Sequence, residues 1–283
     1  KGNSVFVLDG NGNSTGVLNH DLNEIADAYI DFLSGNEHQK SEYIFTIKKS
    51  EVKDHININP QHYSPKLNAA LDSVLAFDNK DNWATTTVGQ LEAGIRIYIG
   101  PRWNSASIKV DNPTDTSNLV PYLTANAALE LRRFTVKWLD ARKANPQQRQ
   151  CIDMLKIHEG DILISRSGTI GKVTYATKDL AENYIVSDDL VRIRVKDANL
   201  RAYLLAYFTS STALALMLLD EYGSVQQHLQ PRHIQEMLIP VPDDWSLAQD
   251  MIDAGNMFIK AMEDMSKADR KIRTQGFDAL IAE

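Results

Sequence analysis

The chain has 283 residues, of which 43% are hydrophobic and 24% are charged, a balance typical of one large or two modest packed domains. No apolar run approaches the ~20 residues that a membrane-spanning helix needs, and no secretory signal pattern opens the chain, so we expect a cytoplasmic protein. Cys151 is the single cysteine, which excludes an internal disulfide framework and a cysteine-based metal cluster.

The first 80 residues predict a small α/β segment. Residues 5–8 are typical of a buried strand, and the Gly- and Asn-rich run 10–16 predicts a loop. Apolar side chains recur on one helical face between Leu22 and Leu33, and residues 43–47 predict a second strand. A further helix is expected after Pro65, since proline suits the first turn of a helix.

Changes in sequence pattern predict three domains. The polar stretch from Asp78 to Asn82 is expected to end the amino-terminal segment. Beyond it the sequence is rich in Thr, Ile, Tyr and Gly, as expected for short strands and turns. We therefore place the domains at residues 1–80, 81–244 and 245–283. The fold class that we expect is α+β, with an irregular β-sheet and flanking helices in the central domain.

Positive charge is concentrated in the middle of the chain. Residues 1–81 carry seven Lys and Arg against twelve Asp and Glu, whereas residues 132–172 carry nine against four. The net charge of −7 therefore does not exclude a nucleic-acid partner, because a basic segment inside an acidic chain suits a protein that binds DNA with one surface. The alternative is a solvated charged face that has no partner.

The stretch most informative for function is residues 160–173, GDILISRSGTIGKV. The apolar run 162–164 and the β-prone run 173–175 flank a tip that holds two glycines, which predicts a β-hairpin. The tip also carries hydroxyl and cationic side chains that suit phosphate oxygens and base edges. A tight structural turn without a ligand explains the same spacing, so the residues alone leave both interpretations open.

Strands and a helix are expected after the hairpin. Residues 183–187 and 190–195 have the β-prone composition of strands. Residues 200–219 have apolar side chains at helical spacing and predict a single helix. The central domain is therefore expected to alternate short strands with helices up to residue 244, where a different pattern begins.

The carboxy-terminal segment carries an unbroken heptad repeat. Apolar residues alternate at spacings of four and three, which is the pattern of a coiled-coil seam. A helix of about 35 residues would span ~50 Å, longer than a domain of this size covers, so we expect it to pair with another helix. The alternative is a helix packed on its own domain. The predicted seam residues are Leu247, Met251, Ala254, Phe258, Ala261, Met265, Ala268 and Ile272.

Three stretches of the chain resemble the target-recognition domain in the specificity subunits of type I restriction–modification enzymes. Residues 160–173 resemble the signature hairpin of that domain. Residues 121–126 resemble the PYL…N element near its start, and residues 222–242 resemble its closing segment, which ends in an IPxP strand. Together they cover about residues 83–283 in the family's order.

The first part of the chain resembles the carboxy-terminal tail of a type I N6-adenine methyltransferase subunit, on residues 5–9, 22–33, 43–47 and 57–63. A methyltransferase tail that continues into a recognition domain implies a fused methyltransferase–specificity polypeptide, of which this is the downstream part. The resemblance implies that S-adenosylmethionine binds the upstream methyltransferase region and that this part of the chain holds no cofactor. It also implies assembly with methyltransferase and restriction subunits or domains.

The resemblance further implies sequence-specific recognition of double-stranded DNA, which directs methylation to a target site. In type I specificity subunits, long helices pair antiparallel. Only one such helix is present here, so the resemblance implies a homodimer through the carboxy-terminal helix. The expected DNA contacts are the hairpin residues Ser165, Arg166, Ser167, Thr169 and Lys172, then Gln226, Gln227 and His228, a third set of Tyr122, Thr124 and Asn126, and the backbone-positioning Arg132 and Arg133.

Catalytic motifs are incomplete in this sequence. Its Asn-Pro pairs lack the second proline and the aromatic residue with which N6-adenine methyltransferases hold an extruded base. The histidines lack metal-ligand spacing, so we predict a non-catalytic chain without a metal site. The competing function is a coiled-coil interaction module that dimerises without reading DNA. Only a DNA reader would combine steep salt dependence with preference for one short sequence.

Overall fold

A computed structural model gives the architecture of the chain and describes residues 6–8, 14–17, 21–36, 65–91, 94–130, 136–218 and 228–275. The chain divides into two compact units at the junction of Ala69 and Ala70. The boundary that we place at residues 78–82 falls inside the second unit. There the Thr85 amide donates to the Asp78 carboxylate at 2.6 Å, which ties this polar stretch to the strand that follows it.

The described part of the first unit contains a β-hairpin and a helix. Strand β1 (Phe6–Leu8) pairs antiparallel with β2 (Ser14–Val17), and α1 (Asp21–Leu33) follows. The predicted first strand and helix agree with this structure, whereas part of the run that we expected as a loop forms β2. The predicted strand 43–47 lies outside the described residues. Helix α2 (Pro65–Leu75) begins at the predicted proline.

The second unit is an α+β domain, as predicted, but its described residues form three sheets instead of one irregular sheet. The hairpin sheet is antiparallel throughout, in the order β4 (Arg96–Ile99), β11 (Leu190–Arg194), β8 (Ile162–Ser165) and β9 (Val173–Tyr175). A second sheet has the order β10 (Ile185–Val186), β6 (Val120–Leu123), β7 (Val136–Leu139) and β5 (Lys109–Val110), and β10 is parallel to β6. The third pairs β12 (Leu238–Pro242) with β3 (Trp83–Thr87).

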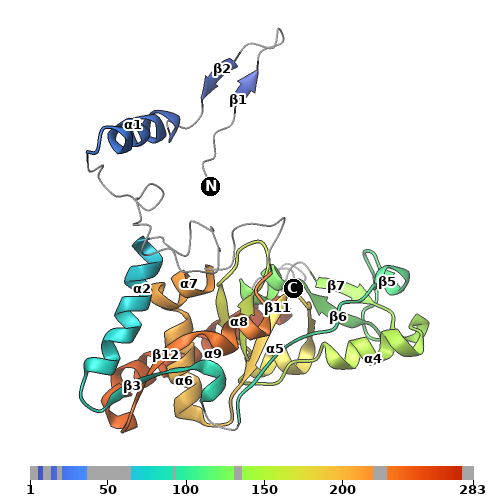
Figure 1. Cartoon of the computed structure of the whole chain (residues 1–283). Helices are drawn as coiled ribbons and strands as arrows, with labels where there is room; N and C mark the ends of the chain where they lie inside the picture. Colours follow the sequence, from blue (N-terminus) through green and yellow to red (C-terminus); the bar gives the residue numbers. More distant parts are fainter. Residues whose placement is uncertain are drawn as a thin grey trace. The chain divides into compact units, whose positions relative to one another are not determined.

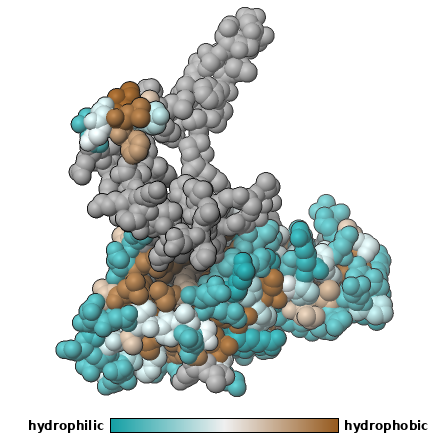
Figure 2. Space-filling model, viewed as in Figure 1, coloured by the Kyte–Doolittle hydropathy of each residue, from teal (hydrophilic) through white to brown (hydrophobic). Residues whose placement is uncertain are grey.

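Helices cover these sheets and connect them. They are α3 (Ala125–Leu129), α4 (Pro146–Met154), α5 (Lys178–Asn183), α6 (Ala198–Phe208), α7 (Ser211–Met217), α8 (Pro231–Glu236) and α9 (Gln249–Gln275). Short 3₁₀ turns are η3 (Ala76–Asn79), η4 (Val88–Gln90), η5 (Ala106–Ile108), η6 (Ala141–Lys143) and η8 (Trp245–Ala248). Figure 2 shows mostly hydrophilic residues over the lobe of β5, β6, β7 and α4.

The single helix that we predicted over residues 200–219 is two helices. α6 ends at Phe208, and α7 starts after Ser210, whose hydroxyl accepts a hydrogen bond from the Ala213 amide. A serine in this position satisfies an amide that the first turn of a helix leaves unpaired, so it starts a new helix instead of continuing the old one. The apolar spacing continues across the break, and periodicity alone therefore did not reveal it.

The two central strands of the hairpin sheet lie in the core. Leu163 of β8 and Val191 of β11 are completely buried, as are their neighbours Ile162, Ile164 and Ile193. Both faces of these strands are covered by the rest of the domain, which explains why the sequence shows a continuous apolar run instead of an alternating one. The hairpin therefore projects from a rigid base.

Arg192 joins the hairpin sheet to the second sheet. It is completely buried in β11, and its guanidinium donates to the carbonyl oxygens of Met154, Lys156, Val186 and Ser187 at 3.0–3.4 Å. Burial lowers the pKa of this guanidinium, because water no longer solvates its charge. The four carbonyls replace that solvation and connect β11 with β10 and the end of α4.

Two tyrosines of α6 hold strand β12. The Tyr203 hydroxyl donates to the Pro240 carbonyl at 2.6 Å, and the Tyr207 hydroxyl donates to the Leu238 carbonyl. These carbonyls lie in a strand whose other partner is β3, so the hydroxyls replace the partners that a further strand would provide. Helix α9 packs along the same helix α6 (Figure 1).

Candidate DNA interface

The predicted hairpin is confirmed, and its tip is built by two glycines. Ile162 of β8 lies opposite Tyr175 of β9, and the chain reverses between residues 166 and 172. Gly168 and Gly171 have φ angles of +70° and +83°, which other residues rarely adopt. The Ser165 amide donates to the Lys172 carbonyl at 2.8 Å and closes the turn. Both glycines therefore serve the turn, and the exposed side chains beside them are free to meet a ligand.

The accessible polar residues at this tip form one surface with part of α3. Thr169, Lys172, Asn126 and Glu130 are exposed, and Ser167 is partly exposed. The Lys172 ammonium lies 3.8 Å from the Glu130 carboxylate, which brings α3 beside the hairpin. We call these five residues the tip surface. Two stretches that are distant in sequence and that we predicted separately as DNA contacts therefore lie together.

The third predicted stretch also reaches the hairpin. The Leu229 amide donates to the Arg166 carbonyl at 2.9 Å, so the segment that precedes α8 is hydrogen-bonded to the start of the tip. His228, the neighbour of Leu229, is partly exposed. Gln226 and Gln227 lie outside the described residues, as do Arg132 and Arg133, which follow Glu130 in the chain.

Arg166 lies against the turn between β10 and β11. Its amide donates to the Asp189 carbonyl at 3.3 Å, and its guanidinium donates to the Asp188 carbonyl at 3.4 Å. The guanidinium Nε is buried and has no hydrogen-bond partner among the described residues. The side chain is partly exposed, so it keeps donors for a ligand while one end is fixed to the protein.

Three predicted contacts make hydrogen bonds or packing contacts within the protein, and two of them, Ser165 and Tyr122, are buried. Ser165 is completely buried, and its hydroxyl donates to the Ser167 carbonyl at 3.1 Å, so it supports the turn. Tyr122 lies in a hydrophobic core beside Trp103, and burial raises the pKa of its phenol. Thr124 caps α3 by accepting from the Ala127 amide. Their polar groups suggested DNA contacts, but strand β6 turns Tyr122 toward the interior.

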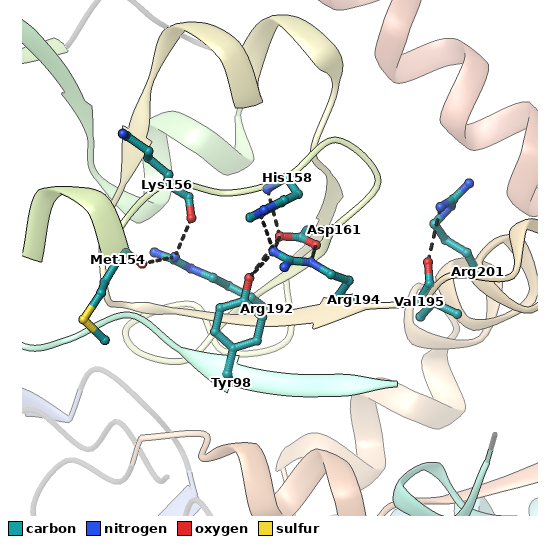
Figure 3. A network of polar contacts seen from close by, with 9 residues as sticks. All are labelled: Tyr98, Met154, Lys156, His158, Asp161, Arg192, Arg194, Val195 and Arg201. Atoms are coloured by element: carbon teal, nitrogen blue, oxygen red, sulfur yellow. Dashed lines mark hydrogen bonds and ion pairs between the residues drawn. The ribbon is translucent and has the colours of Figure 1, made fainter. Parts of the chain in front are cut away.

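A buried ionic network, which the sequence did not reveal, fixes the base of the hairpin (Figure 3). Asp161 is completely buried immediately before β8, and Arg194 of β11 binds both of its carboxylate oxygens at 2.8 and 3.0 Å. The Tyr98 hydroxyl and the His158 amide donate to the same carboxylate at 3.2 and 3.0 Å. Asp161 thus joins β4, β11 and the start of β8, which holds the hairpin in one orientation. Its side-chain partners Tyr98 and Arg194 are far away in sequence, so no local pattern identifies it.

The predicted seam of the carboxy-terminal helix is exposed on this chain. Phe258 is partly exposed, and the other seam residues are exposed: Leu247, Met251, Ala254, Ala261, Met265, Ala268 and Ile272. A different face of α9 packs on its own domain: Ile252 and Met262 are buried, as is Ala248 at the end of η8. The alternative of a helix packed on its own domain therefore holds for one face of α9, and the predicted seam lies on another face that is exposed. Leu247 lies in η8, just before α9 begins.

The described residues give two further findings on candidate sites. Among them, no group of three or more His, Cys, Asp or Glu side chains is placed to hold a metal ion. None of their helices combines the length and the apolar character that crossing a membrane requires.

Comparison with known proteins identifies the domain. Residues 99–252 match the family described as the type I restriction modification DNA specificity domain. Among curated proteins, none matches this chain. The matched residues 99–252 include the hairpin, α3, the segment before α8 and the first turn of α9.

Several solved structures are similar to this chain. The HsdS subunit from Thermoanaerobacter tengcongensis is 16% identical with a TM-score of 0.42, over 76% of this chain and 48% of that chain. The S subunit of a type I restriction–modification system from M. genitalium is 11% identical with a TM-score of 0.42, over 75% and 48%. The type IIG restriction endonuclease BpuSI is 12% identical with a TM-score of 0.45, over 83% and 33%. The chain thus spans about half the length of the two specificity subunits.

The family match covers more than half of the chain and contains the hairpin on which the tip surface is built. A domain of this family recognises a DNA target sequence and is not itself catalytic. This protein therefore belongs to the type I restriction modification DNA specificity domain family.

Proposed function

We propose that the tip surface, together with Arg166, reads one short sequence of double-stranded DNA. The observation that carries this proposal is the meeting of separate predicted stretches at one exposed hairpin. Lys172 contacts Glu130 of the α3 stretch, and Arg166 is hydrogen-bonded to Leu229 of the closing stretch. A hairpin fits the major groove of B-DNA, which admits a two-stranded ribbon.

The side chains at the tip supply the chemistry that base recognition needs. Lysine and arginine donate to guanine O6 and N7, an asparagine amide matches adenine N6 and N7, and hydroxyl groups serve either base edges or phosphates. The tip carries all three kinds of group: the cations of Lys172 and Arg166, the amide of Asn126 and the hydroxyl of Thr169. The buried Asp161–Arg194 pair keeps the hairpin in one orientation, so these groups approach DNA in a fixed arrangement.

Selection from a random duplex library tests this proposal. The protein, both as this chain and as the longer polypeptide that we infer, is expected to enrich one short asymmetric sequence. Binding should weaken steeply as salt rises. This chain holds one recognition domain and contacts fewer phosphates than the longer polypeptide with its methyltransferase region, so the longer polypeptide is the decisive sample. Failure of both samples to enrich any motif would leave the coiled-coil interaction module as the better function.

We also propose that the recognition domain directs an N6-adenine methyltransferase fused before it. The resemblance of residues 1–80 to a methyltransferase tail supports this arrangement, in which S-adenosylmethionine binds the upstream region and the cytoplasm is the site of action. The chain would then work in a complex with methyltransferase and restriction functions. The sequence upstream of Lys1 tests this directly, because it must contain an Asn/Asp-Pro-Pro-aromatic motif.

A homodimer through α9 is the third part of the proposal. Its support is the heptad seam, whose residues remain exposed while another face of the helix packs on its own domain. Leu247, Met265 and Ile272 are 49–61% exposed, which is costly for apolar side chains in water and favours a partner helix. A second copy of this chain supplies the same seam, and an antiparallel pair would hold two recognition domains on one DNA molecule.

A further inference from the structure

Glu130 is a carboxylate at the surface where we propose that DNA binds. It lies at the carboxyl end of α3, and its side chain is 46% exposed, beside a Lys172 side chain that is 49% exposed. Exposed ion pairs at such a distance contribute little to folding. A carboxylate at the end of a helix is also opposed by the partial negative charge of the unpaired carbonyls. Stability therefore does not account for Glu130.

Glu130 affects the affinity of the proposed interface for DNA. Phosphates repel a carboxylate, so Glu130 lowers the affinity for every DNA molecule to which it makes no favourable contact. Asn126 lies on the same face of the helix as Glu130. The Glu130 amide donates to the Asn126 carbonyl at 2.9 Å, and residues at this spacing project from one side. Asn126 is one of the predicted DNA contacts, and Glu130 lies one helical turn away from it.

A base pair offers Glu130 and Lys172 suitable partners. In the major groove, cytosine presents the N4 amino donor beside the O6 and N7 acceptors of its guanine. A carboxylate accepts from the cytosine amino group, and an ammonium 3.8 Å away donates to the guanine. In the free protein the two side chains bind each other, which keeps the acceptor and the donor side by side before DNA arrives.

We propose that Glu130 is a specificity-determining residue, which together with Lys172 reads one G·C base pair of the target. This inference rests on the proposed function and adds an acidic base contact to it. Glu130 is not among the contacts predicted from the sequence, because cations, hydroxyls and amides, and not carboxylates, are the side chains that commonly indicate DNA contacts. Replacing Glu130 by Ala should remove a favourable contact at the target and a repulsive one at every other sequence.

The test compares E130A with the unmutated protein by library selection and by affinity measurements on the selected and on an unrelated duplex. E130A is expected to bind the selected sequence about 5- to 150-fold more weakly, the range of one good base-edge contact, and to lose the preference at one G·C position. Its affinity for the unrelated duplex should rise. Effects of opposite sign on the two duplexes are the signature of a base contact.

E182A is the matched control. Glu182 pairs with Lys178 at 3.7 Å, both side chains are exposed, and the pair lies on α5 outside the tip surface. This variant removes the same charge and should leave the motif and both affinities nearly unchanged. An E130A protein that keeps the whole motif, or binds both duplexes more tightly, would overturn the role of Glu130 alone. Absence of any motif with the unmutated protein would instead overturn the proposed function.

Discussion

Gly255 of α9 lies directly against Ala202 of α6: a Cβ atom at Gly255 would stand 2.0 Å from the Ala202 carbonyl oxygen. The neighbour is backbone and cannot rotate away. The two helices approach this closely only because one of them has no side chain at the contact. Farther along α9, the hydroxyls of Ser266 and Thr177 share a buried hydrogen bond of 3.1 Å. These two contacts fix how the long helix is seated on the recognition domain.

Replacing Gly255 by Ala should therefore destabilise the protein. In an exposed helix this change gains up to about 1 kcal/mol, but forcing extra atoms into a packed contact typically costs ~1–3 kcal/mol. We expect a lower midpoint in denaturant unfolding. Asn256→Ala, on an exposed position of the same helix, serves as the control and should not destabilise. An increase in stability on Gly255→Ala would contradict the close packing of α6 and α9.

Asp161→Asn should loosen the base of the hairpin. The substitution leaves Arg194 without its bidentate partner, and breaking a buried pair typically costs ~3–5 kcal/mol. We expect the lower end of this range, since the Arg194 side chain is 28% exposed and water stabilises it in part. The measurement is the free energy of unfolding in urea. Asp153→Asn, which breaks an exposed pair with Lys156, should change it by no more than about 0.5 kcal/mol.

Stability should fall in alkali because of the tyrosines that hold β12. Burial raises the pKa of Tyr203 and Tyr207 well above the ordinary value of 10.0. Their contribution is complete below pH 10 and is lost as the pH rises above it, because the unfolded chain then releases protons that the folded chain retains. Denaturant midpoints measured on both sides of pH 10 check this.

The double variant Tyr203→Phe/Tyr207→Phe should show a weaker dependence on alkaline pH. At neutral pH it should be less stable by about 1 kcal/mol for each hydroxyl, since the carbonyls of Leu238 and Pro240 lose their donors. Equal pH slopes for the variant and the unmutated protein would mean that other groups produce the alkaline loss.

Ala261→Glu should separate the proposed dimer. The substitution places a charge at the centre of the seam, where an unpaired carboxylate in a helix pair costs several kcal/mol. Light scattering should show a dimer for the unmutated protein and a monomer for the variant. Asn256→Glu introduces the same side chain outside the seam and should remain dimeric. A monomeric unmutated protein would refute the homodimer.

Arg166→Ala separates two roles of the tip arginine. If Arg166 reads a guanine, the variant loses ~1–3 kcal/mol and relaxes the preference at one base position. If it contacts a phosphate, binding weakens uniformly across sequences and the salt slope falls by about one. Affinities for the selected and an unrelated duplex at several salt concentrations decide between the two. Unchanged affinity for both duplexes would remove Arg166 from the proposed interface.

Local sequence patterns predicted the hairpin and the long helix. The hairpin needs an apolar run, two glycines and a second β-prone run, and all of these are neighbours in the chain. The division into three sheets depends on pairings between distant strands. The burial of Arg192 and Asp161 depends in part on partners more than 30 residues away, Met154 for Arg192 and Arg194 for Asp161. No local pattern records such partners. The same reason explains Tyr122, a polar side chain that the fold placed inside.

The four neutral carbonyls that surround Arg192 have a practical consequence. Dissolved ions hardly weaken buried hydrogen bonds between a guanidinium and carbonyl oxygens. The same ions screen the attraction between the exposed side chains of Lys172 and Glu130. Varying the ionic strength should therefore weaken the exposed pair on the tip surface while the contacts of the buried Arg192 stay intact. The dependence of binding on salt concentration therefore measures DNA recognition, while the folded structure stays unchanged.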